Sequence, residues 1–167
     1  IIGRITHFAS RDAMDIETFS DKTAGQLYDE LNVREAAELY ELTFEQLVKL
    51  DRFGEKKAMN LLEAIEKSKG RDLASFLYAL GIPNTGKSTA KMLADHYRDL
   101  HAVMKADVEE LIALPDVGGI VAESIVNFFA DPFVVAGIEK MLSLGVQAKA
   151  PEAPQAVKTD SFFSGKT

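Results

Sequence analysis

The chain has 167 residues, of which 47% are hydrophobic, enough for one domain with a packed core or for two small helical units that share one. It contains no cysteine, which excludes disulfide bonds, thiolate zinc sites and cysteine nucleophiles. Its formal net charge of −7 argues against a protein that surrounds nucleic acid with a broad basic face, so any DNA binding must use few cations and many backbone donors.

Helical periodicity predicts an all-α protein. Residues 1–11 are expected to form a short extended segment, and apolar residues then recur at helical spacing from about residue 20 to residue 144. Gly145 is expected to end the last helix. Capping signals mark three helix starts: Thr43 with Gln46, Asp107 with Glu110, and Asp131 before Pro132. Because no apolar run approaches the roughly 18 residues of a membrane span, we expect a cytoplasmic protein with no membrane contact.

A glycine-centred repeat is the most informative feature. Residues 50–61, 82–93 and 114–125 align, each with an alanine four positions and an aliphatic residue seven positions after the glycine, and the glycines are 32 residues apart. A weaker copy at residues 16–27 has Ser20 in place of glycine. The alanine and the aliphatic residue share one helix face, so each unit reads as helix, hairpin, helix. We therefore predict four tandem helix-hairpin-helix repeats that form two paired units.

A glycine turn that leads into a helix offers unpaired N–H groups at the positive end of the helix dipole, where an anionic oxygen can bind. Lysines follow the glycine in two strong copies and Lys22 follows Ser20 in the weak copy, whereas the third strong copy relies on its backbone alone. Such contacts position a protein on duplex DNA without reading its bases. The predicted phosphate contacts are Gly54, Lys56, Lys57, Gly86, Lys87, Ser88, Gly118 and Gly119, with Arg4, His7 and Arg11 as helpers.

The same residues are open to two other interpretations, a nucleotide-binding loop and a protein-docking scaffold. Residues 81–88 also match the phosphate-loop pattern of nucleotide hydrolases, but residues 72–80 before them read as a capped helix rather than a buried strand. A helical scaffold that docks proteins would need the three glycines for packing. The histidines have no metal-ligand spacing, and no serine, histidine and carboxylate arrangement is present, so we expect no catalytic, metal or cofactor site in this chain.

Two stretches resemble the bacterial NAD-dependent DNA ligases. Residues 3–16 are similar to the segment that follows the zinc finger of that family, and residues 52–62 are similar to its second hairpin. The terminal residues 162–167 resemble the first strand of a BRCT domain. The resemblance implies four parts: a zinc-finger connector at 1–11, a helix-hairpin-helix domain at 12–145, a linker that starts a flexible tail at 146–160, and the start of a BRCT domain at 161–167.

The same resemblance implies a function. The chain would be a fragment that holds nicked duplex DNA for an enzyme that seals nicks in replication and repair at the bacterial nucleoid. The K-x-D-G motif and the zinc-binding cysteines of the family are absent, so NAD, magnesium, zinc and catalysis would belong to other domains of the same polypeptide. Another repair or recombination protein with paired hairpins fits the repeat equally well.

The first hairpin departs from the family pattern, because Thr18, Phe19 and Ser20 replace its usual Gly-Leu-Gly. A positive φ at Ser20 would cost about 1 kcal/mol more than at glycine. We therefore expect the first hairpin to serve packing more than phosphate binding.

Overall fold

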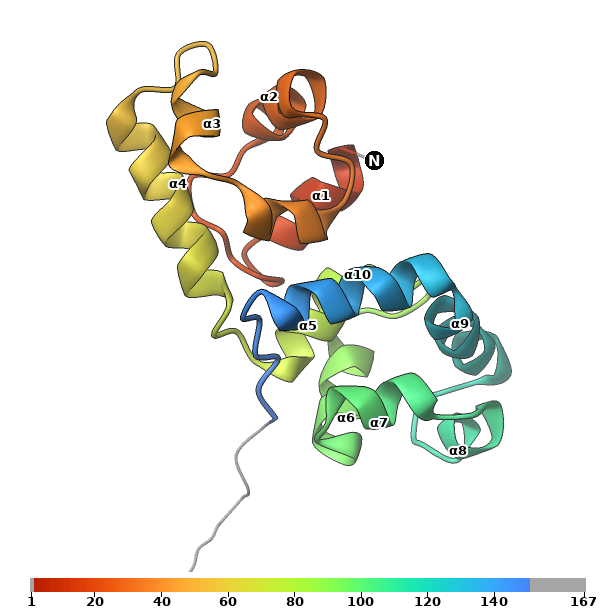
Figure 1. Ribbon diagram of the computed structural model, residues 1–167. Helices are drawn as coiled ribbons and strands as arrows, with labels where there is room; N and C mark the ends of the chain where they lie inside the picture. Colours follow the sequence, from red (N-terminus) through yellow and green to blue (C-terminus); the bar gives the residue numbers. More distant parts are fainter. Residues whose placement is uncertain (1, 151–167) are drawn as a thin grey trace, which may run out of the picture.

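The computed structural model describes residues 2–150, and in this part the all-α prediction is confirmed. Helices α1–α4 and the 3-10 helix η1 form one lobe and helices α5–α10 form a second, with α4 leading from the first lobe to the second (Figure 1). The elements are α1 (Ile2–Ala9), α2 (Asp21–Leu31), η1 (Ala36–Glu41), α3 (Phe44–Val48), α4 (Glu55–Ser68), α5 (Leu73–Ala79), α6 (Lys87–Tyr97), α7 (Leu100–Lys105), α8 (Val108–Ile112), α9 (Gly119–Ala130) and α10 (Pro132–Ser143).

Local capping sets several helix boundaries. The Thr43 hydroxyl accepts from the Gln46 amide while the Gln46 side chain accepts from the Thr43 amide, and Asp107 with Glu110 repeats this capping box. Gly145 has a φ of 109° directly after α10, where a residue with a side chain would be strained. These predicted helix ends are confirmed.

The predicted extended segment at residues 1–11 is wrong, because residues 2–9 form helix α1. Ile5, Phe8 and Ala9 fall on one side of this helix and are buried. An eight-residue helix is marginal in isolation, so it is the packing of this apolar side that stabilises it. Eight residues make only about two helical turns, too few for the spacing of apolar residues to distinguish a helix from an extended segment.

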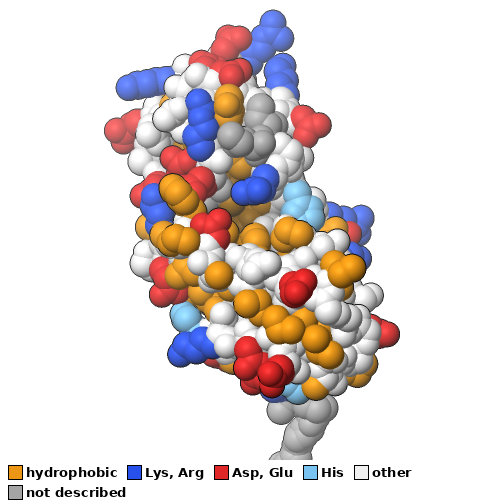
Figure 2. Space-filling view, turned by 90° about the vertical axis from the view of Figure 1, so that its right-hand side faces the viewer, with side chains coloured by type: hydrophobic (Ala, Val, Ile, Leu, Met, Phe, Trp, Pro, Cys, Tyr) orange, Lys and Arg blue, Asp and Glu red, His pale blue; other side chains and the backbone are white. Residues whose placement is uncertain are grey.

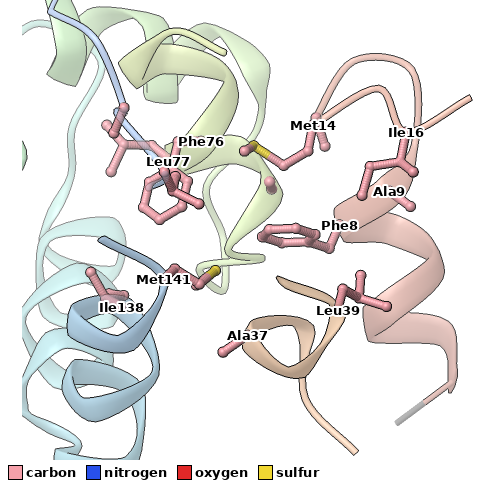
Figure 3. Close-up of a cluster of buried hydrophobic side chains, with 14 of the residues drawn as sticks. Phe8, Ala9, Met14, Ile16, Ala37, Leu39, Phe76, Leu77, Ile138 and Met141 are labelled. Atoms are coloured by element: carbon pink, nitrogen blue, oxygen red, sulfur yellow. The ribbon is translucent and has the colours of Figure 1, made fainter. Parts of the chain in front are cut away.

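The two lobes share one hydrophobic core. Phe8 and Met14 of the first lobe point toward Phe76 and Met141 of the second, and all four side chains are buried (Figure 3). Helix α1 packs against α5, and η1 packs against α10. The lobes are therefore held together by an apolar interface rather than by a linker alone.

One hydroxyl pair is buried beside this core. The Ser68 hydroxyl donates to the Ile65 carbonyl at 2.6 Å, so the Tyr40 hydroxyl donates to Ser68 at 2.8 Å. Burial raises the pKa of Tyr40 to about 12. This contact ties η1 to the end of α4.

The expected linker at residues 146–160 does not begin where it was placed. Val146 and Ala148 are buried, the Gln147 amide donates to the Lys69 carbonyl at 2.8 Å, and the Leu73 amide donates to the Lys149 carbonyl at 2.7 Å. Residues 146–149 therefore belong to the fold and fasten it where α4 gives way to α5. The rest of the expected linker, 151–160, and the BRCT start at 161–167 lie outside the described residues.

Candidate nucleic-acid interface

Four turns that precede α2, α4, α6 and α9 share one backbone geometry. The residues at their helix caps all have negative, extended φ values: Ser20 at −122°, Gly54 at −75°, Gly86 at −94° and Gly118 at −91°. The residues two positions earlier are all left-handed: Thr18 at 66°, Arg52 at 60°, Asn84 at 62° and Asp116 at 63°. The repeat in the sequence therefore corresponds to a repeat in the backbone.

The helix caps differ in how their amides are satisfied. The Ser20 hydroxyl accepts from the Thr23 amide at 3.2 Å, whereas Gly54, Gly86 and Gly118 provide no side-chain cap. The cost of a positive φ at Ser20 does not arise, because its φ is negative. The first turn is distinguished instead by an internal partner for an amide that the other turns leave available to an external acceptor.

The three glycine caps are not required by packing within the chain. A Cβ atom built on Gly54, Gly86 or Gly118 would meet no atom within 4 Å, and the same holds for Gly119. Their φ values also suit any residue. The scaffold hypothesis expects glycines that packing requires at these positions, and the described residues show no such requirement. The space that they leave is open to a ligand that approaches the backbone closely.

The predicted cations lie in different surroundings. Lys56 is exposed in the second turn, and the Lys57 ammonium lies 4.5 Å from the centre of the Phe53 ring. In the third turn, Lys87 and Ser88 are exposed and the Lys87 ammonium lies 3.3 Å from an Asp12 carboxylate oxygen. The fourth turn has no cation after its glycines and instead exposes 73% of Ile120.

Two hydrogen bonds join the helix that follows one turn to a neighbouring turn. The Gln26 side chain donates to the Asp51 carbonyl at 2.7 Å, which links α2 to the second turn. The Asn84 side chain donates to the Ser124 hydroxyl at 2.8 Å, which links the third turn to α9. Gln26 and Ser124 occupy the same position, six residues after their helix caps. One bond thus links the first and second units, and the other links the third and fourth.

The predicted helper residues do not lie in any of the four turns. Arg4 borders an apolar groove between the lobes, together with Phe133 of α10. His7 donates through Nε2 to the Tyr78 carbonyl at 2.8 Å, so this half-buried ring holds α1 against α5. Arg11 is exposed, and its carbonyl accepts from Arg71 at 3.4 Å. Their position gives no support to the helper role.

Two further residues shape the turns: Arg52, which lies within the predicted hairpin of residues 51–57, and Asp12, which was not expected near a turn. Arg52 adds an exposed cation beside Gly54, and Asp12 reaches Lys87 from a distant part of the chain. Asp12 stood out in the sequence only as part of an acidic cluster with Asp15 and Glu17, a pattern that gives no sign of a long-range partner.

The molecular surface has no broad basic area on the side shown in Figure 2. Lysine and arginine side chains are scattered among carboxylates there, and hydrophobic side chains run across its lower part (Figure 2). The turns therefore offer an anion the helix-start amides rather than a broad basic surface.

Two other kinds of site find no support. Helix α5 (Leu73–Ala79) precedes residues 81–88, where a nucleotide-binding phosphate loop would need a buried strand. Within residues 2–150, no group of three or more metal-ligating side chains converges.

No single helix in this part is long and apolar enough to cross a membrane, although α9 and α10 together meet the criteria of length and composition with a bend of 70° between them.

Comparison with known proteins identifies relatives of the chain. The model of the helix-hairpin-helix motif matches residues 75–138, which contain the third and fourth turns. The chain is 52% identical over all 167 residues to a DNA ligase of Alkaliphilus oremlandii and to one of Alkaliphilus metalliredigens, and 48% identical to one of Clostridium novyi. It spans about a quarter of the length of these relatives.

Proposed function

We propose that the chain holds duplex DNA by the backbone for a DNA ligase. It matches the helix-hairpin-helix motif, and its whole length is similar to about a quarter of the length of each of these DNA ligases. The first and second turns, which lie outside the matched residues 75–138, are hairpins of the same kind in this proposal. The homology along the full chain favours a ligase over other repair or recombination proteins with paired hairpins.

The observation that carries the proposal is the set of glycine caps that packing does not require. At Gly54, Gly86 and Gly118 the helix-start amides receive no side-chain cap, and within residues 2–150 no atom beyond the glycine's own chain neighbours lies within 4 Å of a Cβ built there. Amides at the positive end of a helix dipole bind phosphate oxygens, and a bare backbone lets the phosphate come close. Since phosphates carry no sequence information, the binding is independent of base sequence.

The enzyme as a whole would seal nicks in replication and repair in the bacterial cytoplasm, at the nucleoid. NAD, magnesium and zinc would be held by other domains of the same polypeptide, because this chain has no cysteine and no K-x-D-G motif. The contribution of this chain is to position a nicked duplex, with the second and third turns supplying both amides and lysines.

The test compares the parent chain with a variant that carries Gly54→Asp, Gly86→Asp and Gly118→Asp. Aspartate is a favoured helix cap, and the open space at each glycine accommodates it, so the variant is expected to fold. Its carboxylates would accept hydrogen bonds from the helix-start amides and would repel phosphate. We expect binding to a labelled nicked duplex at low salt to fall at least about tenfold, with an unchanged circular dichroism spectrum.

Ser20→Asp is the matched control, because the first turn already satisfies its own amide. It places one new carboxylate at a helix cap and should change affinity much less than any single glycine substitution. Equal affinity of the folded triple variant and the parent would overturn the proposed contacts. Absence of binding by the parent chain would overturn the proposed function.

A further inference from the structure

The lysine of the third turn is already engaged by a carboxylate from elsewhere in the chain. The Lys87 ammonium lies 3.3 Å from Asp12, which lies in the segment between α1 and α2. Both side chains are more than half exposed, at 61% and 56%, so a phosphate could reach the lysine. By contrast, Lys56 in the second turn forms no ion pair with any residue in the described part of the chain.

The surroundings of Lys87 reinforce this difference. One helical turn further along α6, Lys91 pairs with Asp95 at 2.9 Å. Both lysines border an open hollow of about 420 Å³ that is also lined by Asp12, Asp72 and Asp95. Two cations therefore face three carboxylates, and the hollow beside the third turn has no excess of positive charge to offer to DNA.

We propose that Asp12 is an internal competitor of DNA phosphate for Lys87 and so sets the strength of the third turn. The inference rests on the proposed function, since it concerns the same turn. When duplex DNA binds, the Asp12 carboxylate competes with a phosphate for the lysine, so Lys87 neutralises little phosphate charge while Asp12 is present. The second turn, which has no such competitor, then contributes more of the cationic attraction than the third.

The expected size of the effect follows from the exposure of the pair. Exposed ion pairs are weak, so removal of the Asp12 charge should raise duplex affinity by about two- to fivefold at low salt. Removal also leaves Lys87 as an uncompensated cation at the DNA surface. The slope of log affinity against log salt should therefore become steeper by about 0.9, the value for one more neutralised phosphate.

The experiment is a double-mutant cycle in duplex binding with the parent chain, Asp12→Asn, Lys87→Gln and the double variant. Asp12→Asn is expected to strengthen binding in the parent and to have no effect when Lys87 is already replaced. Glu66→Gln is the matched control, because it makes the same change of net charge and breaks an exposed ion pair with Lys69 outside the four turns. Thermal unfolding of each variant verifies that the fold is intact.

Different results would contradict the competition by Asp12 and the proposed binding of DNA. A gain from Asp12→Asn that persists in the Lys87→Gln background, or that only equals the gain from Glu66→Gln, would reflect net charge and would overturn the competition. If neither the parent nor any variant binds duplex DNA, the proposed function fails and this inference fails with it.

Discussion

In each turn, the residue with a left-handed backbone conformation lies two positions before the helix cap. Thr18, Arg52, Asn84 and Asp116 have φ values between 60° and 66°, in the left-handed region. L-residues pay about 1–2 kcal/mol for this conformation, although asparagine and aspartate adopt it more readily than others. Asn84 and Asp116 therefore suit their positions, whereas the β-branched Thr18 is strained. The glycines at the caps relieve no such strain, and the open space beside them is consistent with the close approach of phosphate in the proposed function.

We expect Thr18→Gly to raise the free energy of unfolding by about 1 kcal/mol, because glycine adopts a positive φ without steric cost. The side chain is exposed, so its removal sacrifices little packing. Urea unfolding followed by circular dichroism measures the change. Asn84→Gly is the control and should not stabilise, since asparagine tolerates this φ and its amide bonds to Ser124 at 2.8 Å. A Thr18→Gly variant no more stable than the parent would contradict the assigned strain.

Among the elements, those defined by local chemistry were predictable from sequence and those defined by distant partners were not. The capping box at Thr43 and the glycine repeat depend on residues a few positions apart, so their spacing is visible in the sequence. Helix α1 depends on Phe8 reaching the core between the lobes, and residues 146–149 depend on backbone partners near Leu73. At the candidate site, the glycines were found in the same way, whereas the partner of Lys87 was not.

The segment of residues 146–149 provides a test of how far the fold extends. A chain that ends at Gly145 is expected to be less stable than one that ends at Ala150 by about 2 kcal/mol. It loses the buried Val146 side chain and the hydrogen bonds to Lys69 and Leu73, partly offset by the conformational entropy of the freed residues. Urea unfolding of the two chains measures the difference. Equal stability would show that these residues act as a linker after all.

At the scale of the whole molecule, two pairs of turns are built on one core. The apolar interface around Phe8 and Met141 joins the lobes, so the paired turns of each lobe are held in a fixed relation before any ligand binds. The same molecule carries a net charge of −7, which repels DNA at long range. In the proposed function, affinity therefore comes from short-range contacts that are already in place: the amides at the helix starts, with a small number of cations beside them.

This balance predicts a weak dependence of duplex affinity on salt. With Arg52, Lys56, Lys57 and Lys87 as the cations of the second and third turns, of which Lys87 is compensated, we expect a slope of log affinity against log salt of about −3. Lys56→Gln should reduce the slope to about −2, whereas Lys105→Gln, at the exposed end of α7, should leave it unchanged. Titrations of a labelled nicked duplex at several salt concentrations give these slopes. A parent slope of about −7 or steeper would instead indicate that cations outside the turns neutralise most of the phosphates, and the amide-based account of binding would then be wrong.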